Sequence, residues 1–233
     1  MVDSKKGTRL PLIPLSDFVC FPRTRVRLTV EEPRYRQMVR DLLEHEQEER
    51  LVGIVLVKPG GGDLPAEGRV RREIFPGGTA GRVVEVEPQP DGRSSLLLEG
   101  DFRFLIHRET GSSPYRQALV EAVDEPWFNQ RDAGVVAVRN EILEVVEQVV
   151  EESAGKFPMG PEELTELAGD GDFEALVNRL AMELDVPAMR KLQMLVASLP
   201  ERALLLLSIL KARLHVFDLL RPYRPLGERP ELN

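Results

Sequence analysis

LPLIPLSDFVCFPRTRVRLTV, residues 10–30, reads as two extended segments joined by an apolar corner. Two prolines exclude a helix from the first segment and limit its ladder hydrogen bonds, which is typical of an edge or opening strand. The apolar run at 18–21 ends at Pro22. From residue 25 onward polar and apolar side chains alternate, which is the period of a strand with one face in water. We therefore expect a barrel or a sandwich to begin with these residues.

The composition is typical of a soluble globular protein, since 42% of the 233 residues are hydrophobic and 30% are charged. A membrane helix needs about 18 or more consecutive apolar residues, and no apolar run in the sequence reaches this length; the run at 203–207, for example, ends at Ser208. The N-terminus has no apolar run of signal-peptide length. The single cysteine, Cys20, cannot form an internal disulfide, which agrees with a reducing compartment. We expect a cytoplasmic protein with no membrane partner.

The charge balance counts against a nucleic-acid partner. The formal net charge is -8. Residues 1–125 carry 19 Lys and Arg against 21 Asp and Glu, net -2, and residues 126–233 carry 12 against 18, net -6. Nucleic-acid binders generally present a basic face to the phosphates. We interpret the arginine clusters at 23–27 and 69–72 as solvated strand faces, with a phosphate-binding patch as the alternative.

After the second strand the pattern becomes helical. Pro33 suits a first helical turn. The apolar residues that follow recur at i, i+3, i+4, i+7 and i+8, which predicts one buried stripe made of Tyr35, Met38, Val39, Leu42 and Leu43. His45 lies in a charged run and is interpreted as an exposed residue rather than a metal ligand. The continuous apolar run at 51–57 then predicts a buried strand.

Two glycine-rich stretches, at 58–68 and 76–82, do not fit a phosphate-binding loop. A P-loop needs Gly-Lys and then Ser or Thr where a helix starts, so that amides, lysine and hydroxyl converge on the phosphates. In KPGGGDLPAEG the lysine precedes the glycines and no hydroxyl follows, and PGGTAGR fails the same test. We predict that both stretches are turns.

The second half of the chain changes from strand period to helix period. Further strands are predicted around 84–86, 95–98, 102–107 and 115–123. A hairpin turn is predicted at 88–92, and Gly100 is predicted to interrupt the strand pattern. Beyond Glu125 an amphipathic helix is predicted over 135–149, followed by shorter helices. Ser198-Leu199-Pro200-Glu201 is a capping-box pattern that opens a last, apolar helix.

Four separated motifs resemble the N-terminal LON domain of the ATP-dependent Lon proteases. They are LPLIPLSDFVCFP at 10–22, Gly78-Thr79-Ala80, the turn Pro90-Asp91-Gly92, and Glu99-Gly100-x-x-Arg103. Their order and spacing match, most clearly over 9–124 and more weakly to about residue 220. The resemblance implies an α+β fold, in which a PUA-like six-stranded pseudo-β-barrel with one inserted helix occupies 8–124. An α-helical bundle at 125–221 and a flexible tail at 222–233 would follow.

The same resemblance implies protein binding without catalysis. Lon proteases continue into a AAA+ ATPase and a protease domain with a Ser-Lys dyad, and we expect neither activity here. The sequence has no Walker A motif, and Ser208 and Lys211 are merely three residues apart on one predicted helix, whereas a dyad needs a desolvated lysine. The implied function is recognition of unfolded or exposed apolar polypeptide segments, or service as an adaptor. The expected further partner is a protease or a chaperone, and no cofactor or metal is implied.

The predicted protein-binding residues are aromatic, because aromatic side chains supply a large contact area for little ordering entropy: Phe18, Phe21, Phe75, Trp127 and Phe128. Structural alternatives remain for three of them. Phe18 and Phe21 would also serve to plug the barrel end, and Trp127 would also serve to join the two subdomains.

Two other classes of function stay open, and so does the oligomeric state. An enzyme would need convergent polar groups, whereas the three histidines are scattered and there is one cysteine. An RNA-binding module is suggested by the PUA-like fold alone, which is an analogy, and the net charge counts against it.

Overall fold

The computed structural model describes residues 6–60, 64–66, 69–91, 93–111, 114–125, 129–153, 155–169 and 171–221. The chain divides into two compact units. We call Met1–Phe128 together with Glu174–Arg202 the first unit, and Asn129–Phe173 together with Ala203–Asn233 the second unit. The first unit therefore consists of two separate stretches of the chain.

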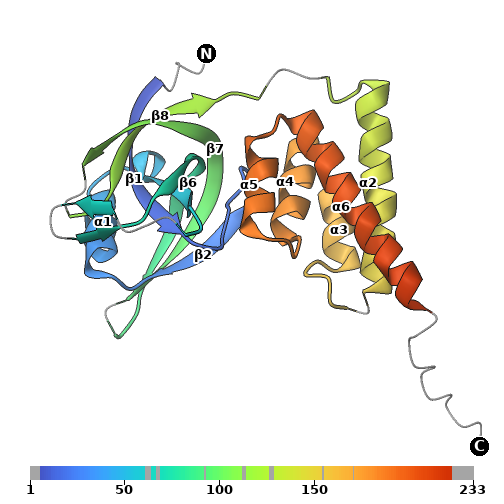
Figure 1. The fold of residues 1–233 in the computed structure, drawn as a ribbon, viewed down its shortest axis with the longest axis horizontal. Coiled ribbons are helices and arrows are strands. Elements are labelled where there is room, and N and C mark those ends of the chain that lie inside the picture. Colours follow the sequence, from blue (N-terminus) through green and yellow to red (C-terminus); the bar gives the residue numbers. More distant parts are fainter. Residues whose placement is uncertain are drawn as a thin grey trace, which may run out of the picture. The chain divides into compact units, whose positions relative to one another are not determined.

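A six-stranded sheet forms most of the first unit (Figure 1). Its strands are β1 (Lys6–Leu15), β2 (Arg25–Val30), β3 (Leu51–Val57), β6 (Ile74–Pro88), β7 (Ser94–Gly111) and β8 (Gln117–Val123). The order is β2-β7-β6-β3-β1-β8, and β7 also pairs with β8, so five strands form a closed ring of ladders to which β2 is added. Two short strands, β4 (Leu64–Ala66) and β5 (Arg69–Arg71), pair with each other. The predicted six strands are confirmed.

β1 is the first strand along the chain, and it lies between β3 and β8 in the sheet. It is therefore not the edge strand that its prolines suggested. The ladder to β8 ends at Pro11 and the ladder to β3 begins at Leu12. Because Leu12 donates its N–H to Arg116 on the β8 side, and because successive strand residues point their N–H groups to opposite sides, Pro11 faces β3 and Pro14 faces β8. Pro11 therefore lies before the ladder to β3 begins, and Pro14 lies after the ladder to β8 has ended. Neither proline removes a hydrogen bond from a ladder.

β6 and β7 are longer than predicted, and both are strongly curved in Figure 1. The stretch 76–82, which we predicted to be a turn, lies inside β6, and Gly100, which we predicted to interrupt a strand, lies inside β7. Both predictions were wrong because Gly78 and Gly100 allow close packing inside the strands. A Cβ on Gly78 would lie 2.5 Å from the Ile54 carbonyl oxygen and 2.8 Å from the Phe104 ring. β6 ends at Pro88 and β7 begins at Ser94, so the described part of the predicted turn at 88–92 lies between these strands, whereas Gly92 lies outside the described residues.

The inserted helix α1 (Pro33–Leu43) is amphipathic, as predicted, and buries Met38, Val39 and Leu42. These side chains belong to an apolar cluster that also contains Val26, Ile54, Leu96 and Leu98 from the sheet, with Tyr35 partly buried against it. Leu43 was expected in the same buried stripe, but its side chain is 44% exposed. Leu43 is the last residue of the helix, so the stripe turns away from the sheet at this point.

The remaining helices are α2 (Ala133–Glu152), α3 (Pro161–Gly169), α4 (Phe173–Glu183), α5 (Ala188–Val196) and α6 (Leu199–Leu220). One half of the predicted capping box at the start of α6 is present, since the Glu201 carboxylate accepts hydrogen bonds from the backbone N–H and the hydroxyl of Ser198. The predicted domains, 8–124 and 125–221, follow the change of period and remain a prediction. The compact units instead place 174–202 with the sheet. Among the described residues, no helix has both the length and the apolar character needed to span a bilayer.

The glycine pair Gly81 and Gly100, which are register partners on β6 and β7, gives a matched test of the packing. A Cβ on Gly100 would lie 2.1 Å from the Phe21 carbonyl oxygen, whereas one on Gly81 would make ordinary contacts at 3.5 Å. We expect Gly100→Ala to lower the free energy of unfolding by about 1–3 kcal/mol or more, the usual cost of overpacking. Gly81→Ala should cost clearly less. Urea unfolding followed by circular dichroism measures both, and equal costs would contradict the assigned role of Gly100.

Candidate functional site

The loop at 16–24, between β1 and β2, is seated on the sheet by backbone contacts. Phe21 is 0% exposed, and its carbonyl accepts a hydrogen bond of 2.7 Å from the Thr24 hydroxyl. The Cys20 carbonyl accepts a 2.6 Å hydrogen bond from the Thr79 hydroxyl on β6. The Gly78-Thr79-Ala80 motif therefore holds the end of the 10–22 motif.

Gly100 holds the other side of the same loop. The Arg23 N–H donates to the Gly100 carbonyl, and the Gly100 N–H donates to the Thr24 carbonyl, both at 2.8 Å. Arg23 has a φ of 60°, which is unusual for a residue with a side chain and marks the tight reversal before β2. Three of the four motifs that carry the resemblance thus meet at this loop. The first motif contains most of the loop, and the other two bind its backbone.

The Cys20 thiol is enclosed by this loop. Its sulfur lies 3.6 Å from the Phe21 carbonyl oxygen and 3.9 Å from the Thr24 hydroxyl. Burial raises the pKa of the Cys20 thiol to about 11, although the hydrogen bonds with Thr24 and Phe21 partly oppose this shift. A thiol in such an environment is a poor nucleophile at neutral pH, so Cys20 is a packing residue here.

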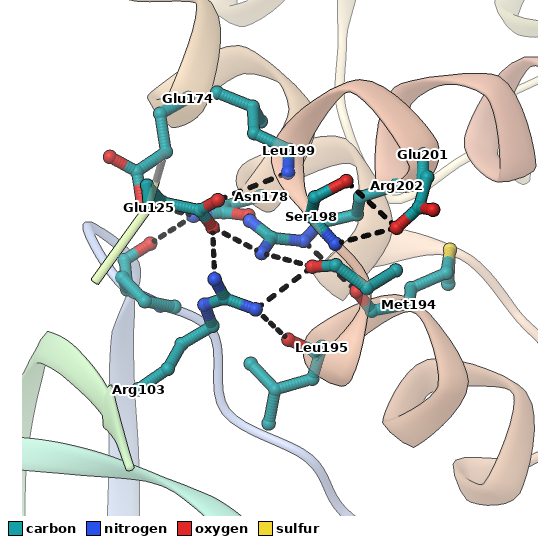
Figure 2. Close-up of polar contacts among 12 residues, drawn as sticks. Arg103, Glu125, Glu174, Asn178, Met194, Leu195, Ser198, Leu199, Glu201 and Arg202 are labelled. Atoms are coloured by element: carbon teal, nitrogen blue, oxygen red, sulfur yellow. Dashed lines mark hydrogen bonds and ion pairs between the residues drawn. The ribbon is translucent and has the colours of Figure 1, made fainter. Parts of the chain in front are cut away.

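A buried cluster of charged and polar side chains lies at the end of β8 in the first unit (Figure 2). The Glu125 carboxylate forms an ion pair with Arg103 at 2.8 Å and accepts hydrogen bonds from Arg202 at 2.6 Å and from the Leu199 N–H at 3.0 Å. Arg103 and Arg202 are 5% and 0% exposed. One carboxylate therefore neutralises part of the charge of two buried guanidinium groups.

The two guanidinium groups also bind the carbonyl groups at the end of α5. Arg103 donates to the carbonyls of Leu195 and Ala197, both at 2.8 Å. Arg202 donates to the carbonyls of Met194 at 3.0 Å and Ala197 at 3.1 Å. The last carbonyls of a helix have no partner within the helix and carry partial negative charge. The cluster thus caps α5 and fastens it to β7.

Asn178 of α4 connects this cluster to the loop at 16–24. Its side-chain oxygen accepts a 2.6 Å hydrogen bond from Arg202, and its nitrogen donates to the Pro22 carbonyl at 3.1 Å. The same nitrogen lies 3.4 Å from Glu174, whose carboxylate also pairs with Arg23 at 3.2 Å. α4, α5 and the first turn of α6 are therefore held to the sheet through a continuous polar network in the first unit.

The chemistry of this network is structural. Burial and the neighbouring Arg202 lower the pKa of Arg103, while Glu125 opposes that shift, and an arginine remains charged in such surroundings. The donors of the two arginines are bound to carboxylate, amide and carbonyl oxygens, so the network offers no nucleophile and no free acid. Among the described residues, no group of three or more His, Cys, Asp or Glu side chains could hold a metal ion.

The predicted aromatic contact residues differ from one another in how far they are buried. Phe21 is buried, in agreement with the plug alternative. Phe18 is partly buried against the α1 cluster, and Phe75 is half-buried on β6. Trp127 and Phe128 lie outside the described residues. The structure therefore leaves Phe18 and Phe75 as the two described members with accessible surface.

Exposed apolar side chains of the first unit were missed by the sequence reasoning. Val196 at the end of α5 is 56% exposed and Leu105 on β7 is 47% exposed. A Cβ on Gly77 would lie 3.1 Å from Val196 and 3.8 Å from Leu105, so the three residues are neighbours. The available signal was that Leu105 alternates with the phenylalanines of β7 and so faces outward. The glycine that brings α5 close could not be read from the periodicity.

The fold is that of the N-terminal domains of Lon proteases. A Lon N-terminal domain protein from Xanthomonas campestris superimposes with a TM-score of 0.60 at 21% identity, over 86% of this chain and 98% of that chain. The N-terminal domain of the Lon protease from the Mycobacterium avium complex gives 0.63 at 16% identity, over 89% and 98%.

The sequence comparisons identify the family. Residues 9–212 match the family described as the ATP-dependent protease La (LON) substrate-binding domain, and the chain belongs to this family. Relatives include the Lon protease of Parabacteroides distasonis, 22% identical over 92% of this chain, and Lon protease 2 of Sorangium cellulosum, 28% identical over 65%. The chain spans 25% and 19% of the lengths of these two proteins. The matched region is the substrate-binding domain and not the catalytic part.

Glu125→Gln tests the buried cluster. We expect this change to lower the free energy of unfolding by about 3–5 kcal/mol, because it leaves two buried guanidinium groups without their carboxylate. The control is Glu73→Gln, which breaks the exposed pair between Lys58 and Glu73, each 41% exposed. That change should cost about 1 kcal/mol or less. Denaturant unfolding measures both, and a small loss for Glu125→Gln would show that the cluster is not stabilising.

The Cys20 thiol should make stability depend on alkaline pH. In the unfolded chain the thiol ionises near its ordinary pKa of 9.0, while the folded protein keeps the proton to about 11. Stability is therefore intact below pH 9 and falls between pH 9 and 11 by up to about 1.4 kcal/mol per pH unit. In Cys20→Ala this contribution should vanish, while other groups titrate as before. Unfolding at pH 8, 9.5 and 10.5 compares the two proteins, and parallel profiles would contradict the prediction.

Proposed function

We propose that this protein binds unfolded or exposed apolar segments of other polypeptides, either to recognise them or to act as an adaptor. The observation that carries the proposal is the match of 9–212 to a substrate-binding domain family, which includes both the strands and most of the helices. The matched relatives bear the name Lon protease, and the chain matches about a quarter of their length or less. The substrates of a protease are polypeptides, so a polypeptide is the ligand class that this family description supports.

The proposed contacts are the accessible aromatic residues of the first unit, with the neighbouring apolar side chains. Phe18 and Phe75 retain accessible surface, and Trp127 and Phe128 remain proposed members of the site. Phe21 supports the loop from beneath, because it is buried. Leu105 and Val196 add apolar surface where α5 meets β6.

We propose further that the protein binds without cutting its ligand. Ser208 and Lys211 are each engaged elsewhere within the second unit, since Ser208 donates to the Leu205 carbonyl and Lys211 pairs with Glu141 at 2.5 Å. This arrangement does not bring the amine to the hydroxyl, as a catalytic dyad requires. A role in the cytoplasm beside a protease or a chaperone fits this activity. The closed ring of ladders supports the finer description of the sheet as a PUA-like pseudo-barrel.

The single tryptophan, Trp127, offers a direct test of binding. Reduced and carboxymethylated ribonuclease A is unfolded and has no tryptophan, so any change in emission on titration reports on this protein. We expect a saturable change in Trp127 emission, without nucleotide, because an aromatic residue at a contact loses water when the ligand binds. Native ribonuclease A is the control and should produce no change.

Two results would overturn the proposal. One is the absence of binding to the unfolded polypeptide by both Trp127 emission and analytical ultracentrifugation. The other is degradation of the polypeptide by the purified chain, followed by gel electrophoresis with and without ATP. Binding seen by ultracentrifugation without an emission change would retain the function and remove Trp127 from the contact set.

A further inference from the structure

A groove of about 640 Å³ lies between α1 and the paired ends of β6 and β7 in the first unit. Arg36, Arg40 and Leu43 line it from the helix, and Val86 and Pro88 line it from β6. Its volume falls within the range of sites that hold small ligands or a few side chains. None of the described residues that line this groove belongs to the aromatic contacts proposed above.

One wall of the groove is apolar and accessible. Leu43 is 44% exposed although it follows a stripe of buried residues, and Pro88 is exposed as well. Val86 packs on the α1 cluster beneath the groove and so fixes the position of this wall. An exposed leucine at the edge of a rigid helix and sheet is a ready contact for an apolar side chain of a ligand.

The charge of the groove is of one sign. Arg36 and Arg40 are one helical turn apart and line the same groove, and none of its described lining residues is acidic. Arg40 is exposed and donates to the Gln37 side chain at 2.7 Å, with no acidic partner in the part of the chain that the structure describes.

The arginines around the groove, unlike Arg40, pair with acidic side chains among the described residues. Arg27, Arg34 and Arg93 pair with Glu87, Glu32 and Glu31 at 2.7, 2.7 and 2.9 Å. Acidic side chains at the surface thus neutralise the cations around the groove, whereas none of the described acidic residues pairs with Arg40. On a protein with a net charge of -8, the groove is therefore a local site that favours anionic groups.

We propose that this groove binds an extended polypeptide segment in which an apolar side chain is adjacent to acidic residues. The apolar side chain contacts Leu43 and Val86, and a carboxylate meets Arg40, with which it forms a charge-assisted hydrogen bond. The inference rests on the proposed function and adds a preference that the family description does not contain. A polynucleotide would supply anions to the arginines but leave the apolar wall without a partner.

The test uses three fluorescein-labelled peptides of equal length and the full chain, with binding followed by fluorescence anisotropy. The first peptide carries Leu beside Asp and Glu, the second has Lys in place of the acids, and the third has Ser in place of Leu. We expect the first to bind about tenfold more tightly than the second, and its affinity to fall as salt is raised, because exposed charges are screened.

Variants place this preference in the groove. Arg40→Glu should weaken the acidic peptide about tenfold and narrow or reverse the preference over the lysine peptide, while Leu43→Ser should weaken both leucine peptides about three- to fivefold. The matched control is Arg190→Glu on α5, an exposed arginine that donates to the Gln193 side chain three residues away, as Arg40 does to Gln37. It carries the same change of charge outside the groove and should leave the affinity within twofold of the parent. Circular dichroism checks that all variants fold.

Several outcomes would overturn the inference. Equal losses for Arg40→Glu and Arg190→Glu would mean that only overall charge matters. Unchanged peptide affinity in the groove variants, with Trp127 still responding to unfolded polypeptide, would remove this site and leave the proposed function intact. Absence of polypeptide binding by the parent would remove both. Displacement of the peptide by a polynucleotide, or a change of sedimentation coefficient in Arg40→Glu without peptide, would assign the groove to nucleic acid or to a second copy of the chain.

Discussion

The Glu125 carboxylate binds two buried guanidinium groups and one backbone N–H, and the arrangement of the first unit depends on these contacts. Removing three charged side chains from water costs several kcal/mol for each ion, and pairing offsets this cost only where the remaining donors are also satisfied. Here the carbonyls at the end of α5 and the amide of Asn178 accept those donors. The network therefore specifies where α5 and the start of α6 lie against β7, which apolar packing alone would fix less closely.

The loop at 16–24 depends on the same network from its other side. Asn178 binds the Pro22 carbonyl, Thr79 binds the Cys20 carbonyl, and Gly100 admits the Phe21 backbone at a distance that no side chain would allow. These contacts concern main-chain atoms, so they require small or hydroxyl-bearing residues at only a few positions. The exposed apolar side chains and the groove beside α1 therefore lie on a scaffold whose geometry is set elsewhere.

The sequence predicted the parts of the fold that local pattern determines. The strand at 51–57, the helix at 33–43 and one half of the capping box of the last helix follow from periodicity and from caps, and all are present. The stretch 76–82 was taken for a turn because its glycines are turn residues in isolation. Their role comes instead from Ile54 and Phe104, which lie far away in sequence. Arg103 appeared in a motif, but its partners at 125, 195 and 197 follow only from tertiary structure. For the same reason, the spacing of residues in the sequence could not show that Leu43 is exposed or how far each predicted aromatic contact residue is buried.

The first unit is discontinuous in sequence, and this has a consequence for synthesis on the ribosome. β1 pairs with β8, so the ring of ladders cannot close before about residue 123 has emerged. Asn178 and then Arg202 join the network only after residues 129–173 of the second unit have been synthesised. Until then the pair between Arg103 and Glu125 lacks Arg202 and the carbonyl groups at the end of α5. A fragment that ends at Glu125 would keep the six strands and the pair between Arg103 and Glu125, but it would lack Asn178 and Arg202.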